Sequence, residues 1–188
     1  MANKLALILQ IKRIFSHKVS NVLLSEFNHL DAPCLIQHLQ HCVKIPRWAE
    51  QIVQQRPYSS TADLLETAAQ AAQSWQWSEI SAALHSHPKI GEKAAEHALS
   101  DQEQAFSAQE QAAVTCDPNT THALYQGNLA YEKKYGFIFL IRAAGLDQKQ
   151  ILSALHQRLN HDTEIEKVIV HQQLCEIALR RLTQELAA

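Results

Sequence analysis

The sequence predicts an all-α protein, and three observations support that fold class. The 188 residues include only four glycines and five prolines, which leaves little turn chemistry for a sheet of many strands. Alanine, leucine, glutamine and glutamate are frequent, and all four are good helix formers. Apolar residues recur at helical spacing along most of the chain. Since a chain of this length can bury its own core, we expect one compact bundle of about eight helices.

Charge and cysteine content narrow the class of protein further. The formal net charge is −2, without a basic tail, so nucleic acid is not an expected partner. The four cysteines are scattered without a Cys-x-x-Cys pair, which is typical of reduced thiols in a cytoplasmic protein. The apolar run at 5–11 is too short to cross a bilayer. We expect a cytoplasmic protein with no membrane partner, in which 1–21 is an extension of unknown role and 22–188 is the domain.

The helices expected in the first half begin at recognisable caps. Asp31 is a suitable N-cap within the apolar stretch, and Pro46 can open the next helix. Pro57 predicts a loop, because the residue before a proline avoids the α region. Ser60 is placed to start a helix with a capping box, and Pro88 ends the last helix of this half. The expected helices lie within 22–43 and over about 46–55, 60–75 and 77–85.

The second half predicts four more helices and one irregular segment. The helices are expected from about 107 to 116, from 120 or 121 through 131, from 147 to about 159, and from 163 through 182. Asp147 with Gln150, and Thr163 with Glu166, have the spacing of capping boxes. The strand-like run near 136–141 has no second run to pair with. We therefore expect extended backbone there, packed into a helical core, with peptide groups able to meet a ligand.

Candidate chemistry begins at His87, a histidine at a proline-marked break. A helix opening follows in which Ser107, Glu110 and Gln111 supply a hydroxyl, a carboxylate and an amide. Each feature has an ordinary structural alternative. A histidine near a helix end commonly caps carbonyls. Ser-x-x-Glu is itself a helix N-terminal capping box, and spacing alone favours that interpretation.

An arginine near the end of the chain is the other candidate. Arg181 falls on the apolar side of the last predicted helix, whereas Arg180 lies farther round toward solvent. A buried arginine needs a carboxylate partner or an anionic ligand. Glu166 and Glu185 are possible partners, so the position alone leaves a structural role and a ligand-binding role open.

A zinc site is the third possibility that spacing raises. Cys34, His38, His41 and Cys42 could share one helix face. Four ligands on one helix cannot easily surround a tetrahedral ion, because structural zinc sites usually draw ligands from two elements. We therefore expect no metal site.

A series of short motifs supplies more information than any single residue. In chain order they are Phe27-Asn28, Arg56-Pro57-Tyr58, Ser86 through Gly91, Ser107-x-x-Glu110-Gln111, Asn128-x-x-Tyr131, Tyr135 through Phe139, Arg158-Leu159, Glu176-Ile177 and Arg181-Leu182. Their order and spacing resemble the 2-oxo-4-hydroxy-4-carboxy-5-ureidoimidazoline (OHCU) decarboxylase family. The resemblance extends over about 22–188.

The resemblance implies a fold, an activity and a set of residues. The fold would be compact and helical, the protein a homodimer, and the reaction a cofactor-free decarboxylation of OHCU to (S)-allantoin in urate degradation. Catalytic roles are implied for His87, which suits proton transfer, for Glu110 and for Arg181, with Arg180 as the rival if the register slips by one. The implied substrate-binding residues are Pro88, Ser107, Gln111, Phe137, Ile138, Phe139 and Ile141.

Two other functions stay open at this stage. The chain could be a non-catalytic helical interaction domain, in which the same residues are caps and surface ion pairs. It could also be a metal-binding helical protein that uses His38, His41 and the cysteines.

Overall fold

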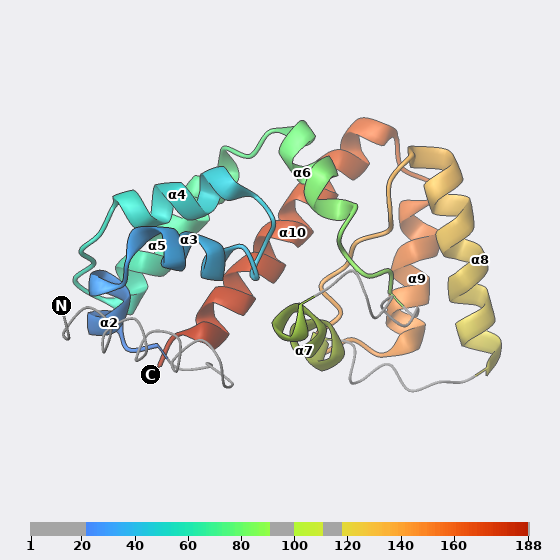
Figure 1. Cartoon of the computed structure of the whole chain (residues 1–188). Helices are drawn as coiled ribbons and strands as arrows, with labels where there is room; N and C mark the ends of the chain where they lie inside the picture. The colour runs from blue at the N-terminus through green and yellow to red at the C-terminus, as the bar shows by residue number, and fades with distance from the viewer. Residues whose placement is uncertain (1–21, 91–99, 111–117, 188) are drawn as a thin grey trace.

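The all-α fold class is confirmed by the computed structural model, which describes residues 22–90, 100–110 and 118–187 (Figure 1). Over these residues there are nine helices and one isolated bridge, between Val22 and Leu186. The helices are α2 (Leu24–His29), α3 (Ala32–Leu39), α4 (Pro46–Gln54), α5 (Thr61–Gln73), α6 (Trp77–Leu84), α7 (Asp101–Glu110), α8 (Pro118–Tyr135), α9 (Gln148–Arg158) and α10 (Thr163–Glu185). None of these helices is both long and apolar enough to span a membrane.

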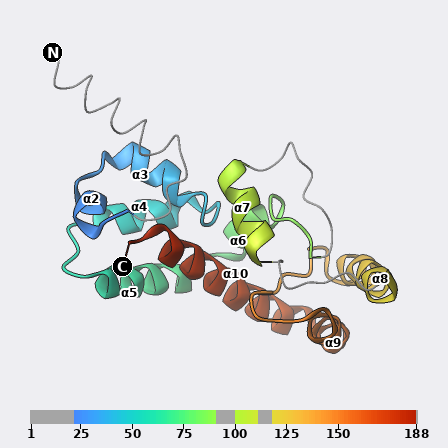
Figure 2. The ribbon, with the colours of Figure 1, turned by 90° about the horizontal axis from the view of Figure 1, so that it is seen from below.

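Helix α10 is the element on which the others are arranged. Its 23 residues make it roughly 35 Å long at the usual helical rise. Helices α2 to α5 lie toward its C-terminal end, and α8 and α9 lie toward its beginning, with α6 and α7 between the two groups (Figures 1 and 2). α10 packs directly against α5 and α6, while α8 and α9 pack against each other.

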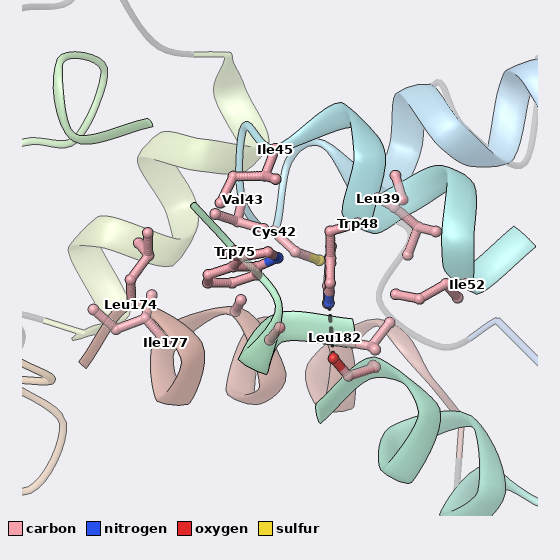
Figure 3. Close-up of a cluster of buried hydrophobic side chains, with 14 of the residues drawn as sticks. Leu39, Cys42, Val43, Ile45, Trp48, Ile52, Trp75, Leu174, Ile177 and Leu182 are labelled. Atoms are coloured by element: carbon pink, nitrogen blue, oxygen red, sulfur yellow. Dashed lines mark hydrogen bonds between the residues drawn. The ribbon is translucent and has the colours of Figure 1, made fainter. Parts of the chain in front are cut away.

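The larger core surrounds Trp48 on α4, which has no exposed surface (Figure 3). Its indole N–H donates to the carbonyl of Ala68 at 2.9 Å, so the one polar atom of the ring is satisfied. The ring of Trp75 meets it edge-on, with the centroids 6.1 Å apart. α10 contributes Leu174, Ile177 and Leu182 to the same core. The α10 residues that fill this core therefore fix the helix that also carries Arg181.

A second core lies between α8, α9 and the irregular segment that follows α8. Gly136, at φ 77°, adopts the left-handed conformation that ends α8. Gly127 lies within α8, and a Cβ at that position would collide with the side chain of Leu155 on α9. Glycine at this position lets the Leu155 side chain pack directly against the α8 backbone, and a larger residue would force that side chain to move. Phe139 of the irregular segment is buried in this core.

A buried carboxylate holds the irregular segment in place. Glu166 on α10 has no exposed surface and accepts hydrogen bonds from Arg158 Nη2 at 2.8 Å, from Tyr131 and from His161 Nδ1 at 2.9 Å. Burial alone would raise the pKa of Glu166, but these hydrogen bonds, first that from Arg158, hold it below its usual range. Arg158 Nη1 also donates to the carbonyl of Leu140 at 2.7 Å. The segment after α8 thus gains a backbone partner without belonging to a sheet.

Several predicted helix ends are confirmed and others are wrong. Asp31 is the N-cap of α3, Pro46 opens α4, and Asp147 with Gln150 forms the capping box of α9. The box predicted at Thr163 is wrong, because Asp162 is the N-cap of α10 and the Glu166 side chain turns into the interior.

Two further helix starts come earlier than predicted. α8 starts at Pro118 rather than at 120 or 121, since proline suits the first helical turn. The helix predicted to open at Ser107 begins at Asp101, so Ser107 lies inside α7. The residues that cap α7 are Ser100 and Glu103: the Ser100 N–H donates to Glu103 Oε2 at 2.8 Å, and the Glu103 N–H donates to Ser100 Oγ at 3.3 Å. The predicted extension at 1–21 and the helix end predicted near 116 lie outside the described residues.

The buried Arg158–Glu166 pair predicts a large loss of stability on Arg158→Met. The substitution would leave the Glu166 carboxylate buried with one cationic partner fewer, at a cost of about 3–5 kcal/mol in the free energy of unfolding. Lys167→Met is the control, because it removes a largely exposed pair with Glu164 and a contact of the ammonium with the Trp77 ring, which together contribute about 1–2 kcal/mol or less. Urea denaturation measures both. Equal losses in the two variants would contradict this account of Glu166.

Candidate active site

Four segments of the chain meet at one pocket with an empty volume of about 330 Å³. The turn after α6 supplies His87 and Pro88, and α7 supplies Ser107 and Glu110. The other two segments are α10 and the irregular segment after α8. The residues that line the pocket are His87, Pro88, Ile90, Ser107, Glu110, Phe139, Leu140, Ile141, Ala143 and Ile177. The polar lining residues are His87, Ser107 and Glu110, which come from the turn after α6 and from α7. The rest of the lining is apolar.

Arg181 and Glu110 form a buried two-pronged ion pair beside this pocket. Arg181 Nε donates to Glu110 Oε1 at 2.7 Å, and Nη2 donates to Oε2 at 2.8 Å. The Arg181 side chain is 5% exposed and that of Glu110 is 13% exposed. The partner of the buried arginine is therefore Glu110, and neither Glu166 nor Glu185, while Arg180 points to solvent. A planar guanidinium that meets a carboxylate in this way fixes the orientation of both groups.

His87 lies next to the guanidinium group. Its Nε2 is 3.5 Å from Arg181 Nη2, and its backbone N–H donates to Leu84 at 3.0 Å, which ties the residue to the end of α6. Burial and the nearby charge of Arg181 lower the pKa of His87 from 6.5 to about 3. The imidazole is therefore neutral at physiological pH. Because a guanidinium can only donate, we infer that Nε2 accepts and that Nδ1 carries the proton.

The arrangement can bind a small polar anion and move a proton. Arg181 supplies a positive charge and the N–H groups that its pair with Glu110 leaves over, Glu110 supplies acceptors, and the neutral imidazole of His87 can take up a proton. The apolar wall made by Phe139, Leu140 and Ile177 limits the access of water, which strengthens the charged interactions.

The family model that matches this chain is that of OHCU decarboxylase, and the match covers residues 28–183. The chain belongs to the OHCU decarboxylase family. One curated relative is the uric acid degradation bifunctional protein TTL of Arabidopsis thaliana, which is 30% identical to this chain over 103 residues. That alignment covers 54% of this chain and 32% of the relative, so the chain spans about a third of the relative's length.

Two solved structures share the fold of this OHCU decarboxylase family member. A crystal structure of OHCU decarboxylase in the presence of (S)-allantoin is 22% identical, with a TM-score of 0.63, and the match covers 77% of this chain and 94% of that one. A crystal structure of (S)-allantoin synthase is 17% identical, with a TM-score of 0.65, over 88% of this chain and 54% of that one. The fold is therefore shared along most of the chain.

The residues that sequence reasoning assigned to substrate binding divide into two groups in this family member. Pro88, Ser107, Phe139 and Ile141 line the pocket. Phe137 and Ile138 are absent from the lining, and both pack against the larger core. The Phe137 ring contacts Trp77 at a centroid distance of 4.8 Å. Gln111 lies outside the described residues.

Four apolar lining residues were missed at the sequence level: Ile90, Leu140, Ala143 and Ile177. Of these, only Ile177 carried a usable signal, because it precedes Arg181 by four residues on one face of α10.

No metal-binding cluster of His, Cys, Asp or Glu occurs in the described ranges 22–90, 100–110 and 118–187. His38, one of the residues considered for zinc, instead contacts Glu185 at 2.8 Å. Burial raises the pKa of the Cys42 thiol, which keeps it protonated and a poor ligand.

The low pKa of His87 predicts a specific pH dependence of stability. Between about pH 3 and pH 6.5 the unfolded chain protonates this histidine and the folded protein does not, so the free energy of unfolding falls as the pH falls. From pH 7 to pH 5 the loss attributable to His87 is up to about 2 kcal/mol. Urea denaturation of His87→Gln at both pH values should show a drop smaller by that amount than in the unsubstituted protein. An equal drop in both proteins would contradict a half-buried imidazole that stays neutral in the folded protein.

Proposed function

We propose that this protein catalyses the cofactor-free decarboxylation of OHCU to (S)-allantoin in urate degradation. The observation that carries the proposal is the contact of Arg181 with both His87 and Glu110, two residues that line one pocket, although the three come from separate parts of the chain. Membership of the OHCU decarboxylase family supports it. So does the shared fold with a structure solved in the presence of (S)-allantoin.

The chemistry of the substrate explains why protein side chains suffice. OHCU carries a carboxylate and a hydroxyl on one ring carbon, and the neighbouring carbon carries the ureido group and forms a C=N bond. When the C–C bond to the carboxylate breaks, CO₂ leaves, and the electron pair moves toward the C=N nitrogen, which gains one proton from water. The resulting enol loses its hydroxyl proton as the C=O forms, and the ureido-bearing carbon gains one proton.

His87 is the proposed proton-transfer group. A neutral imidazole can accept the hydroxyl proton, and the low pKa of His87 keeps it in that form at physiological pH. The proton then returns to the ureido-bearing carbon from one fixed side. Protonation from one side gives a single enantiomer, and the (S) form is the one that the family relationship indicates.

Glu110 and Arg181 are proposed to hold the substrate in position for this step. The Glu110 carboxylate can accept hydrogen bonds from ureido N–H groups, and Arg181 can donate to the substrate carboxylate or carbonyl. Their mutual ion pair orients both side chains before the substrate binds. Ser107 adds a hydroxyl to the same wall of the pocket, and Gln111 follows Glu110 directly in the sequence.

The capping interpretation of Ser107 and Glu110 no longer competes with this proposal. Ser107 lies in the interior of α7, and Ser100 with Glu103 caps that helix. A non-catalytic interaction domain can therefore no longer account for these two residues as helix caps.

We also propose that the protein is a cytoplasmic homodimer, as the family relationship implies. Large apolar side chains on α8 and α10 are exposed and available for an interface: Tyr125, Leu129, Ile165 and Val168. Sedimentation of the full chain would measure the assembly.

A stereochemical assay tests the activity. The unstable substrate is generated from urate by the two upstream enzymes, and circular dichroism is followed after this protein is added. Spontaneous decay gives racemic allantoin, so a fast and persistent signal of (S)-allantoin is the expected result. No signal above the blank, from folded protein, would contradict the proposed function.

Adjacent arginines provide a matched pair of variants. Arg181→Ala removes the buried fork and leaves Glu110 without its partner, so we expect kcat/KM to fall by about 100-fold or more. Arg180→Ala changes an exposed side chain and should stay within about threefold of the unsubstituted protein. The same dichroism assay measures both, and thermal melting controls for folding. A loss in Arg180→Ala without one in Arg181→Ala would show that the register of the site is wrong.

A further inference from the structure

Helix α7 carries two of the proposed site residues but little apolar surface. Of its ten residues, Phe106 is the large apolar side chain that is buried, and Ala105 and Ala108 are exposed. Helices normally take their position from an apolar face that packs into a core. α6 has such a face, since Ile80 and Leu84 are buried. The position of Ser107 and Glu110 must therefore depend on other contacts of α7.

Polar contacts to the rest of the molecule supply that attachment at the first turn of α7. Glu103 Oε1 lies 3.1 Å from Lys44 Nζ, and Ser100 Oγ lies 3.2 Å from His41 Nδ1. Gln102 Nε2 donates to Glu185 Oε1 at 2.6 Å. Burial alone would raise the pKa of Glu103, but hydrogen bonds from Ser100 and Lys44 lower it, so the carboxylate is charged at neutral pH.

Lys44 is a firm anchor for this attachment because its backbone belongs to the larger core. Its neighbours Val43 and Ile45 are buried, and the Ile45 N–H donates to the carbonyl of Val43 at 2.9 Å. The Lys44 side chain is 40% exposed, while that of Glu103 is 10% exposed. The pair therefore joins a partly exposed ammonium group, carried on a backbone that the core fixes, to a nearly buried carboxylate of α7.

The pair lines a second hollow, with an empty volume of about 280 Å³, behind the proposed site. Lys44, Glu103 and Arg181 are part of its lining. His87 and Pro88 line both this hollow and the first pocket. Glu103 therefore lines a hollow beside His87, while Glu110 of the same helix lines the pocket on which His87 also borders, so a change in the position of α7 would alter the distance from Glu110 to His87.

We propose that Lys44 and Glu103 are positioning residues of the proposed decarboxylase. Their ion pair fixes the first turn of α7, and the helix then carries Ser107 and Glu110 to the pocket. The expected effect of this ion pair on turnover rests on the proposed function. The docking of α7 itself does not depend on that function and can be measured without substrate.

Lys44→Met tests the role directly. The variant keeps the apolar stem of the side chain and removes the charge, so the core around Val43 and Ile45 is preserved and the melting temperature should change by a few degrees at most. We expect kcat/KM for (S)-allantoin formation to fall by about 10- to 100-fold, the effect of a displacement of roughly 1 Å at a reacting group. Lys44→Arg restores the charge and should return turnover to within about threefold. Glu103→Gln is the second variant, because its amide oxygen can still cap α7 at Ser100 while the charge is lost.

Arg47→Met is the matched control. Arg47 is 39% exposed and pairs with Glu79, so the substitution removes an ion pair of similar exposure. That pair joins α4 to α6, which is held by its own apolar face. We expect turnover within about threefold of the unsubstituted protein.

Hydrogen exchange separates this inference from the proposed function. Without substrate, Lys44→Met should increase amide exchange in the peptide that covers 101–110, and Arg47→Met should not. If the unsubstituted protein forms no (S)-allantoin, the proposed function fails, and the exchange data alone decide whether the pair docks α7. If the unsubstituted protein is active, unchanged turnover in both Lys44→Met and Glu103→Gln would overturn the positioning role. Turnover in Lys44→Arg as low as in Lys44→Met would overturn it as well.

Discussion

The buried ion pair between Arg181 and Glu110 is the interaction on which the candidate site depends. It joins α10, the longest described helix, to α7, a helix with almost no apolar face of its own. The same guanidinium lies beside His87, and its charge contributes to the low pKa of that histidine. One cation therefore fixes the orientation of the carboxylate and, after the burial of the ring, is the second cause of the low pKa that keeps the imidazole neutral. A charge buried in this way is costly unless it is paired, which is why the site must be assembled around it.

The scaffold explains how such a pair can be held. α10 packs into the larger core through Leu174, Ile177 and Leu182, so the backbone that carries Arg181 is fixed by apolar burial. The opposite wall has no regular secondary structure, and its order depends on the Arg158–Glu166 pair, through the hydrogen bond from Arg158 to the Leu140 carbonyl. One wall of the pocket is thus fixed by apolar packing, and the other by apolar packing together with a buried network of charges.

Sequence reasoning reached the fold class and the buried position of Arg181, because both follow from helical periodicity. It failed at α7 for a local reason: Ser100 with Glu103, and Ser107 with Glu110, have the same capping-box spacing. Only tertiary contacts distinguish them, since Glu103 pairs with Lys44 and Glu110 pairs with Arg181. The assignment of Phe137 to substrate binding came from the family resemblance, and the sequence pattern alone does not tell which rings of this aromatic segment face a core. The ring of Phe137 packs on Trp77 instead.

A double-mutant cycle on Arg181 and Glu110 tests the central claim most directly. The kcat/KM for (S)-allantoin formation is measured for Arg181→Ala, for Glu110→Ala and for the double variant. If the two residues act as one unit, the double variant should be no worse than the poorer single variant by more than about threefold. Losses that multiply would show that the arginine and the glutamate act independently, and would contradict an account in which their ion pair organises the site.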